Sequence, residues 1–472
     1  MLFEEELPFI KEFVEEIDEK LRAYKEGSRL SEIQKKWLSF CIMAIALTNS
    51  VNWAKFERVS LRKYSYQALS WMFRHSKIDW ENLLSASVKV ILSKYGIKKG
   101  MLVADDTDKA RSKVTKRIYG VHKIRDKKSG GYIMGQTIVI LLLVTQEITL
   151  PVGFSFYRPD PKQKAWEKED KKLRKAGVAK KNRPAKPQRD KSYPTKQEIL
   201  LQLLAKFRIE HSEIKIRMLV ADSVYGKAEF CKQAAALFSD LQIISQIHSN
   251  QKVHFNNRSM SAKEYFKIYP GICQEIKIRG LQSIKANISS ARLYLEAHEQ
   301  KRFIVAIKYE EEREYRYLFA TDMSWRTIDI AQGYTLRWLA EVFIEDFKLC
   351  QGWGQLTKQM DVEGSSRSLI LSLLLDHCLL FHPQQQAFIE NNLPASTVGS
   401  LLEKIRLDSF LAFIRSLLSC DNLAEKLELL AQSLADIFSL SASKKHMSGR
   451  NLGHLEPSPS LFRRAKLAQL PS

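Results

Sequence analysis

Two stretches of the chain read almost alike: MLVADDT at residues 101–107 and RMLVADSVYG at residues 217–226. Each is a run of apolar residues that stops at an aspartate, Asp105 in the first and Asp222 in the second. Such a run predicts a short buried strand, and the aspartate that follows it is held rigidly at the edge of a sheet. The two stretches therefore predict two similar strands, each with a carboxylate at its carboxyl end.

The residues around these stretches predict the rest of an α/β core. Strands are expected at 132–145 and 148–158, joined by a tight turn, and at 241–247. Helices are expected at 195–207, where Thr195 and Glu198 form a capping box, and at 227–238. The order is three hairpin-linked strands followed by alternating helices and strands, with a helix at 326–350 last. This order predicts an RNase H-like fold.

The predicted fold brings the two aspartates together, since the first and fourth strands of such a sheet lie side by side. Two carboxylates that close repel unless a cation lies between them. Either aspartate alone is more often a turn or helix-capping residue, but the matching pair is harder to attribute to chance. Asp106 and Asp108 compete with Asp105, which we prefer because it aligns with Asp222 at the end of the matching MLVAD.

Residues 334–348, YTLRWLAEVFIEDFK, predict an amphipathic helix. At 100° per residue four polar side chains fall on one stripe roughly 60° wide; they are Tyr334, Arg337, Glu341 and Lys348. A carboxylate can hold a divalent metal, and the other three can hold phosphate oxygens. Glu345 lies on the same stripe, one turn from Glu341, and is its rival. A solvated face of mixed charge is the plain alternative.

Composition points to a polyanionic partner. The chain has 472 residues with 75 Lys and Arg against 53 Asp and Glu, a net charge of +22, which favours nucleic acid. The six cysteines are scattered without a CxxC pair, which argues against a disulfide framework and a zinc site. The acidic start lacks the features of a signal peptide, and the longest apolar run, residues 138–144, is too short to span a bilayer. We therefore expect no membrane association and a cytoplasmic, nucleoid-associated protein.

Two segments interrupt the predicted core. Residues 158–194 form a polar, Pro-containing basic loop; its 158–191 part holds 14 Lys and Arg against 5 Asp and Glu. A solvated loop would account for it, but so much charge favours contact with a phosphate backbone. Residues 248–325 predict a β-rich insertion. The core as a whole is placed at 98–355.

The flanks read as helical. Residues 1–97 are expected to be a helical DNA-binding region, since 56–75 mixes basic and aromatic residues in the manner of a helix-turn-helix. A helical cap on the next domain is an equally good interpretation. Residues 356–443 form a second helical region, and 444–472 are expected to be a basic disordered tail.

These residues resemble a known family, the DDE transposases of bacterial insertion sequences, and among them the insertion-sequence-four family. The family motif is Tyr, two residues, Arg, three residues, Glu, six residues, Lys, which the stripe on 334–348 matches without a gap. The DDT at 105–107, Gly135-Gln136, DSVYG at 222–226 and the β-rich insertion also lie where the family pattern has them. The resemblance covers about 100–355.

The resemblance implies cut-and-paste transposition of DNA. Asp105, Asp222 and Glu341 would be catalytic and would hold two Mg²⁺ ions, with Mn²⁺ as an alternative. Tyr334, Arg337 and Lys348 would bind DNA phosphates, and Trp325 would stack on an unpaired base, although a core or hairpin aromatic is its commoner role. The partners would be double-stranded DNA, both the element's terminal inverted repeats and the target, and a second copy of the chain in a synaptic homodimer.

Two other functions stay open. An RNase H-like nuclease would cut DNA without joining it, as a domesticated copy would. A DNA-binding protein that kept the fold without catalysis is less favoured, because all three carboxylates are present.

Overall fold

The computed structural model describes residues 6–24, 27–60, 63–111, 117–126, 130–278, 282–310, 312–356 and 358–418, and a few residues between 422 and 431. The chain divides into two compact units, 1–420 and 421–472, and the elements named below all belong to the first unit. The basic tail predicted at 444–472 and most of the last predicted helical stretch lie outside the described residues.

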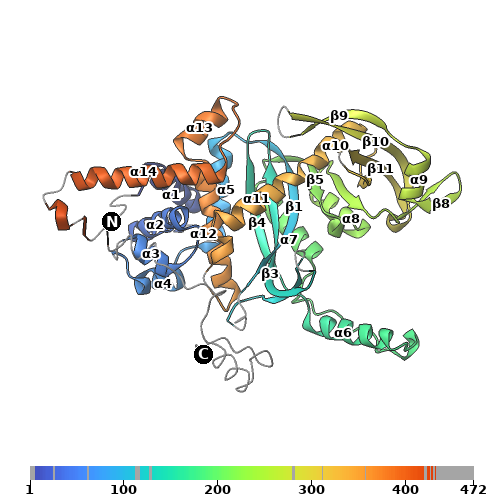
Figure 1. Cartoon of the computed structure of the whole chain (residues 1–472), viewed down its shortest axis with the longest axis horizontal. Helices are drawn as coiled ribbons and strands as arrows, with labels where there is room; N and C mark the ends of the chain where they lie inside the picture. Colours follow the sequence, from blue (N-terminus) through green and yellow to red (C-terminus); the bar gives the residue numbers. More distant parts are fainter. Residues whose placement is uncertain are drawn as a thin grey trace, which may run out of the picture. The chain divides into compact units, whose positions relative to one another are not determined.

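Five strands form the centre of the first unit: β1 (Lys99–Ala110), β3 (Tyr132–Val144), β4 (Thr149–Tyr157), β5 (Lys215–Ala221) and β6 (Gln242–Ile247). Their spatial order is β4-β3-β1-β5-β6. β3 is antiparallel to β1 and β4, while β1, β5 and β6 are parallel. This order and these directions are those of an RNase H-like fold, so the predicted fold class is confirmed (Figure 1).

The central strands are buried because their sequence is apolar on both sides. In β3 every residue from Gly135 to Val144 is buried, and consecutive buried residues mean that both faces of the sheet are covered. α7 (Lys196–Glu210) packs on β3 and β4, and α5 (Trp80–Lys94) and α12 (Val362–Leu379) also contact β4. α7 begins with the predicted capping box of Thr195 and Glu198.

Strand β1 differs from the sequence prediction. It does not end at Asp105 but continues to Ala110, paired with β3 along its whole second half. A short strand that the sequence did not predict, β2 (His122–Arg125), pairs with the start of β3. Only the parallel pairing of β1 with β5 stops at Ala104, so Asp105 marks the end of that ladder and not the end of its strand.

The β-rich segment after β6 is present, and it extends the same sheet. β12 (Arg316–Ala320) pairs antiparallel with β6, and β11 (Gln300–Tyr309), β10 (Gln282–Leu295), β7 (Lys252–Phe255) and β8 (Arg258–Ser261) follow outward. β9 (Ile272–Ile278) also pairs with β10, and α9 (Ala262–Ile268) follows β8. One twelve-stranded sheet therefore runs through core and insertion (Figure 1).

The two helical flanks pack on each other. The N-terminal helices are α1 (Pro8–Arg22), α2 (Glu32–Thr48), α3 (Trp53–Val59), α4 (Tyr66–His75) and α5. α12 packs on α1, α2 and α5, and α14 (Val398–Leu418) packs on α2. His377 of α12 ties three elements together, because its ring nitrogens bond Ser87 of α5 at 2.8 Å and the carbonyl of Pro151 in β4 at 2.9 Å. DNA binding by residues 1–97 stays a prediction.

Among the described residues, no single helix has both the length and the apolar character to cross a membrane; the bent pair α12 and α13 (Pro383–Glu390) reaches that threshold together, by length and composition alone.

Two further predictions of local structure were wrong. The basic segment is not a loop throughout, because residues Pro161–Lys175 form helix α6. The helix expected at 326–350 is two helices, α10 (Thr327–Thr335) and α11 (Arg337–Leu349), separated at Leu336. Tyr334 and Arg337 therefore lie on different helices.

Candidate active site

Asp105 and Asp222 each follow directly after the last parallel pair of β1 and β5. The parallel register of β1 and β5 ends with Ala104 opposite Ala221, and the next residue on each chain segment is an aspartate. The Asp222 carboxylate then begins a short 3₁₀ turn, Ser223–Tyr225, by accepting the Ser223 N–H at 2.6 Å. The register thus agrees with the expectation from sequence that these two carboxylates lie together.

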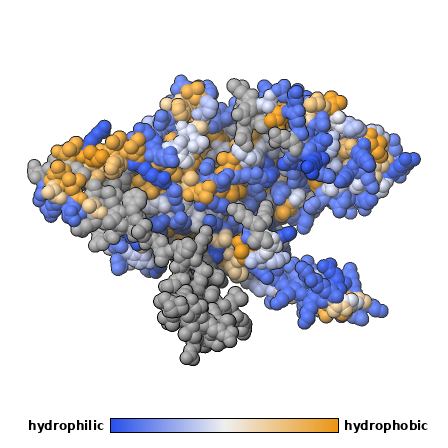
Figure 2. Space-filling model, viewed as in Figure 1, coloured by the Kyte–Doolittle hydropathy of each residue, from blue (hydrophilic) through white to orange (hydrophobic). Residues whose placement is uncertain are grey.

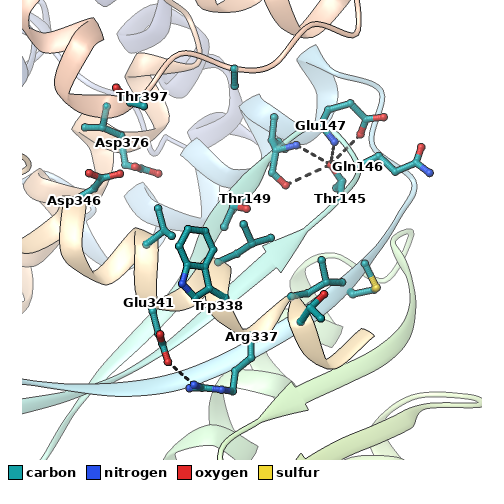
Figure 3. Close-up of a pocket in the computed structure, with 18 of the residues that line it drawn as sticks. Thr145, Gln146, Glu147, Thr149, Arg337, Trp338, Glu341, Asp346, Asp376 and Thr397 are labelled. Atoms are coloured by element: carbon teal, nitrogen blue, oxygen red, sulfur yellow. Dashed lines mark hydrogen bonds and ion pairs between the residues drawn. The ribbon is translucent and has the colours of Figure 1, made fainter. Parts of the chain in front are cut away.

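Helix α11 brings Glu341 to the same place through an arginine. Arg337 donates to the Asp105 carboxylate at 3.2 Å and forms an ion pair with Glu341, one turn further along α11. Figure 3 shows Arg337 and Glu341 facing each other. The Asp105 side chain is 14% exposed, whereas that of Glu341 is 48% exposed. Arg337 therefore joins a mostly buried carboxylate to one that is open to solvent.

The surroundings of Asp105 disfavour the ionised form of its carboxyl group. Burial raises the pKa of Asp105 to about 6, against the lowering effects of the Asp106 N–H and the Arg337 guanidinium; the charges of Asp106 and Asp222 raise it further. The Asp106 N–H donates to the Asp105 carboxylate at 2.8 Å. A second cation at this site would favour the ionised form of Asp105.

Asp106 faces the other way, because successive side chains on a strand alternate between its two sides. Its carboxylate accepts a hydrogen bond from the Lys196 ammonium at 2.5 Å and a longer one from the buried Tyr225 hydroxyl at 3.4 Å. Lys196 is the first residue of α7. Asp108 accepts from Thr137 of β3. Asp105, and not Asp106, shares a side with Arg337 and Glu341.

The other site residues predicted from the sequence do not lie on one face of a single helix. Tyr334 is 3% exposed and lies near the end of α10, and burial raises its pKa to about 12. Lys348 is half-buried near the end of α11, and Trp325 is half-buried just before α10. Glu345 is exposed. The single exposed stripe of four side chains was thus a wrong prediction, because the break at Leu336 separates Tyr334 from the other three.

A cleft of about 1160 Å³ runs along α11. Arg337, Trp338 and Glu341 line one part of it, and Asp346 and Asp376 another (Figure 3). Tyr309 and Arg316 of the insertion also line it. Sequence reasoning missed Lys196, Trp338 and these two insertion residues. Trp338 stands next to Arg337 in the motif, which was a usable signal; nothing in the sequence pointed to the other three.

The candidate metal ligands do not form a closed cluster. Within the described ranges, no three His, Cys, Asp or Glu residues come together closely enough to hold a metal ion. The Arg337 guanidinium, which contacts both Asp105 and Glu341, supplies the positive charge between them. The ligand set of Asp105, Asp222 and Glu341 therefore stays a prediction.

Comparison with known proteins defines the matched part of the chain. Residues 40–267 match the DDE superfamily endonucleases. This region, a little under half of the chain, contains Asp105 and Asp222 and ends before Glu341. Enzymes of this superfamily typically use divalent metal ions. No curated protein matches the chain significantly in sequence.

Among solved structures, the chain is similar to a piggyBac transposase whose cryo-EM structure is a synaptic complex with hairpin DNA. The identity is 10% and the TM-score 0.41, over 93% of this chain and 85% of that one.

Proposed function

We propose that this protein is a transposase that moves an insertion sequence by cut-and-paste phosphoryl transfer, with Asp105, Asp222 and Glu341 as its catalytic carboxylates. The observation that carries the proposal is the convergence of these groups from three elements. Asp105 and Asp222 follow the last register pair of β1 and β5, and Arg337 joins Asp105 to Glu341. The match to the DDE superfamily endonucleases over residues 40–267 supports the same chemistry.

The three carboxylates carry oxygen donors of the kind that bind divalent cations. Hard oxygen donors are the ligands that Mg²⁺ prefers, with Mn²⁺ as an alternative. The buried Asp105 carboxyl, whose pKa is raised to about 6, has Arg337 as its cationic partner. We infer that Asp105, Asp222 and Glu341 hold two Mg²⁺ ions when Arg337 turns away. Bound metal would lower the pKa of the attacking water or 3′-hydroxyl and stabilise the leaving oxygen.

The residues of α11 would bind and orient the DNA. Arg337, released from the carboxylates, is placed to bind a phosphate oxygen with its planar fork. Lys348 would neutralise a second phosphate. Tyr334 is buried behind Arg337 and would act by supporting it or by becoming exposed when DNA binds. Trp325 would stack on an unpaired base.

The finer aspects of the proposal follow the motif on residues 334–348. They are membership of the insertion-sequence-four family, terminal inverted repeats and target DNA as partners, and a synaptic homodimer. A cytoplasmic, nucleoid-associated location is proposed separately, from the acidic start of the chain and its short apolar runs. The net charge of +22 supports the DNA partner, since a polyanion is attracted over a distance.

A nuclease that cuts DNA without joining it is the second candidate. It is favoured by the family match, whose description names only the endonuclease activity. The two functions share the carboxylates and differ in whether the freed 3′-hydroxyl is joined to a target.

The test is cleavage of a linear duplex that carries the DNA flanking the gene, with Mg²⁺, by wild type, Glu341→Ala and Glu345→Ala. Both glutamates are exposed and lie one turn apart on α11, so each controls for the other. We expect Glu341→Ala to lose cleavage by at least about 100-fold, with DNA binding retained and Glu345→Ala active. Joining of the cut end to a plasmid separates transposase from nuclease.

Two outcomes would contradict the proposal. Cleavage by Glu341→Ala but not by Glu345→Ala would show that the catalytic glutamate is Glu345, one turn further along α11. A wild-type protein that binds the duplex and never cuts it would remove the catalytic function altogether.

A further inference from the structure

Helix α6 belongs to none of the packed layers. Its fifteen residues, Pro161–Lys175, include no buried side chain, although most helices of globular proteins bury an apolar face. It stands away from the central sheet in Figure 1, and Figure 2 shows a mostly hydrophilic surface along it. What holds this helix in place is therefore the segment that returns from it to α7.

The side of α6 that faces the return segment is fixed by polar contacts. The Trp166 indole N–H donates to the Pro184 carbonyl at 2.8 Å, and Arg183 pairs with Asp170 at 2.8 Å. Gln163 donates to the Pro187 carbonyl. At 100° per residue, Gln163, Trp166 and Asp170 point within about 60° of one another. This side of the helix is thus occupied.

The opposite side of α6 carries a row of lysines. Counted in the same way, five of them fall within about 100° of arc, centred on the side away from the return segment; they are Lys164, Lys168, Lys171, Lys172 and Lys175. All five are exposed. The row is roughly 16 Å long at 1.5 Å per residue. Lys164 pairs with Glu167 at 2.8 Å, while the other four form no ion pair with any residue that the structure describes.

The base of α6 is tied by polar contacts to the first turn of α7, on the side of β1 opposite Asp105. The Asp160 carboxylate accepts N–H groups from Lys162 at 2.8 Å and from Asp190 at 3.0 Å, so the two ends of the segment meet. Arg189 forms a two-pronged ion pair with Glu198 in the first turn of α7. The same turn holds Lys196, which contacts Asp106 beside Asp105.

We propose that α6 is an arm that binds the phosphate backbone of duplex DNA outside the catalytic site. The inference rests on the proposed function for the identity of the polyanion. Lysines bind phosphates as point charges without reading sequence, and a single exposed row suits the backbone of a rod-like partner. Trp166 faces the return segment, so the lysine face has no apolar anchor of the kind that membrane-surface helices use.

The experiment compares two variants with four charges removed from each. The arm variant replaces Lys168, Lys171, Lys172 and Lys175 by Gln. The control replaces four exposed lysines of α8 (Ala228–Leu237) and the insertion by Gln: Lys232, Lys252, Lys267 and Lys301. Binding to a random-sequence 40-base-pair duplex is measured by fluorescence anisotropy between 50 and 200 mM KCl without Mg²⁺, after circular dichroism shows that both variants are folded.

Each phosphate contact contributes about 0.9 to the slope of log K against log salt. With four contacts removed, we expect the arm variant to lose up to about 3.6 in that slope and at least about tenfold in affinity at 100 mM KCl, and the control to lose much less. A third variant, with residues 163–187 replaced by a short Gly-Ser linker between the two ends that meet at Asp160, should lose at least as much of the slope as the arm variant. Equal losses in arm variant and control would overturn the proposal, as would an unchanged slope in the arm variant or tighter binding of the arm to anionic vesicles than to DNA.

Failure of the arm and failure of the proposed function remain distinguishable, because binding is measured without cleavage. If wild type cuts DNA and the arm variant keeps its full salt slope, the arm proposal fails alone. If the arm variant loses the slope and wild type never cuts, the arm is upheld and the transposase function fails.

Discussion

Asp105 and Asp106 are consecutive residues of the same strand, and the two sides of β1 treat them differently. Asp106 is neutralised within the fold by Lys196, with the Tyr225 hydroxyl as a second donor. Asp105 shares one guanidinium with Glu341 and lies beside Asp222, and burial raises its pKa to about 6. The number of carboxylates on β1 therefore says less about function than the cations available to each of them.

The same contrast suggests which side of the sheet does chemistry. A carboxylate that is already paired with a lysine from a neighbouring core helix stabilises the fold. A mostly buried carboxylate that shares its cation with an exposed glutamate is ready to accept another cation. Substitutions on each side of β1 test this assignment.

Replacing each aspartate by asparagine should give the largest difference. Asp105→Asn removes a charge from the proposed metal site and should reduce DNA cleavage at least about 100-fold. Asp106→Asn leaves that site intact and should keep cleavage within about fivefold of wild type, since it changes only the contacts with Lys196 and Tyr225. Single-turnover cleavage with saturating Mg²⁺ measures both. Loss of activity in Asp106→Asn alone would assign the catalytic role to the other side of β1.

Asp105→Asn should also change stability in a pH-dependent way. Because the folded state raises the pKa of Asp105 from 3.8 to about 6, ionising this carboxyl costs free energy in the folded protein. The variant should therefore be more stable than wild type above pH 6, by roughly 3 kcal/mol without metal. The gain should shrink as the pH falls from 6 to 4, where wild-type Asp105 becomes protonated in the folded state and then in the unfolded state. Urea unfolding of metal-free protein between pH 4 and 8 provides the measurement.

A gain that is equally large at pH 4 would show that the effect is one of packing and not of charge. Excess Mg²⁺ should reverse the order at pH 7.5, because only wild type would gain stability from bound metal.

The smallest expected effect is on stability and concerns the ion pair between Lys196 and Asp106. Lys196→Met removes the cation of Asp106, which is mostly buried, and should lower the free energy of unfolding by about 1 kcal/mol. Adding Asp106→Asn should restore part of this loss, since no unpaired carboxylate remains. Urea unfolding of the two single variants and the double variant at pH 7.5 tests the pair. Strict additivity of the two substitutions would mean that Lys196 and Asp106 are not coupled.

Much of the core could be predicted because its sequence patterns are local. The apolar run of β3, the Thr195–Glu198 capping box and the repeated MLVAD each specify their element without help from the rest of the chain. The topology then placed Asp105 beside Asp222. The continuation of β1 past Asp105 depends instead on pairing with β3, which no pattern within residues 105–110 reveals.

The parts that could not be predicted depend on contacts between distant residues, or on the competition between helix preference and charge within one segment. The break at Leu336 has no Pro to mark it, and the nearby Gly333 of α10 packs close to Met218 of β5, a tertiary contact. In α6 the helix preference of the Lys, Glu and Ala residues outweighs the high charge that favours a solvated loop. The link from Arg337 to Asp105 joins residues 232 positions apart.

The edge shared by core and insertion matters while the chain folds. β6 pairs on one side with β5 and on the other with β12, about 70 residues later in the chain. Until the insertion has folded and β12 has docked, β6 presents a row of unpaired N–H and C=O groups. Its first four side chains, which are buried in the folded protein, lie along that edge. Such an open edge templates association with other chains. The insertion therefore serves as the edge protection of the central sheet, and a chain from which residues 248–325 are deleted should aggregate before it can be assayed.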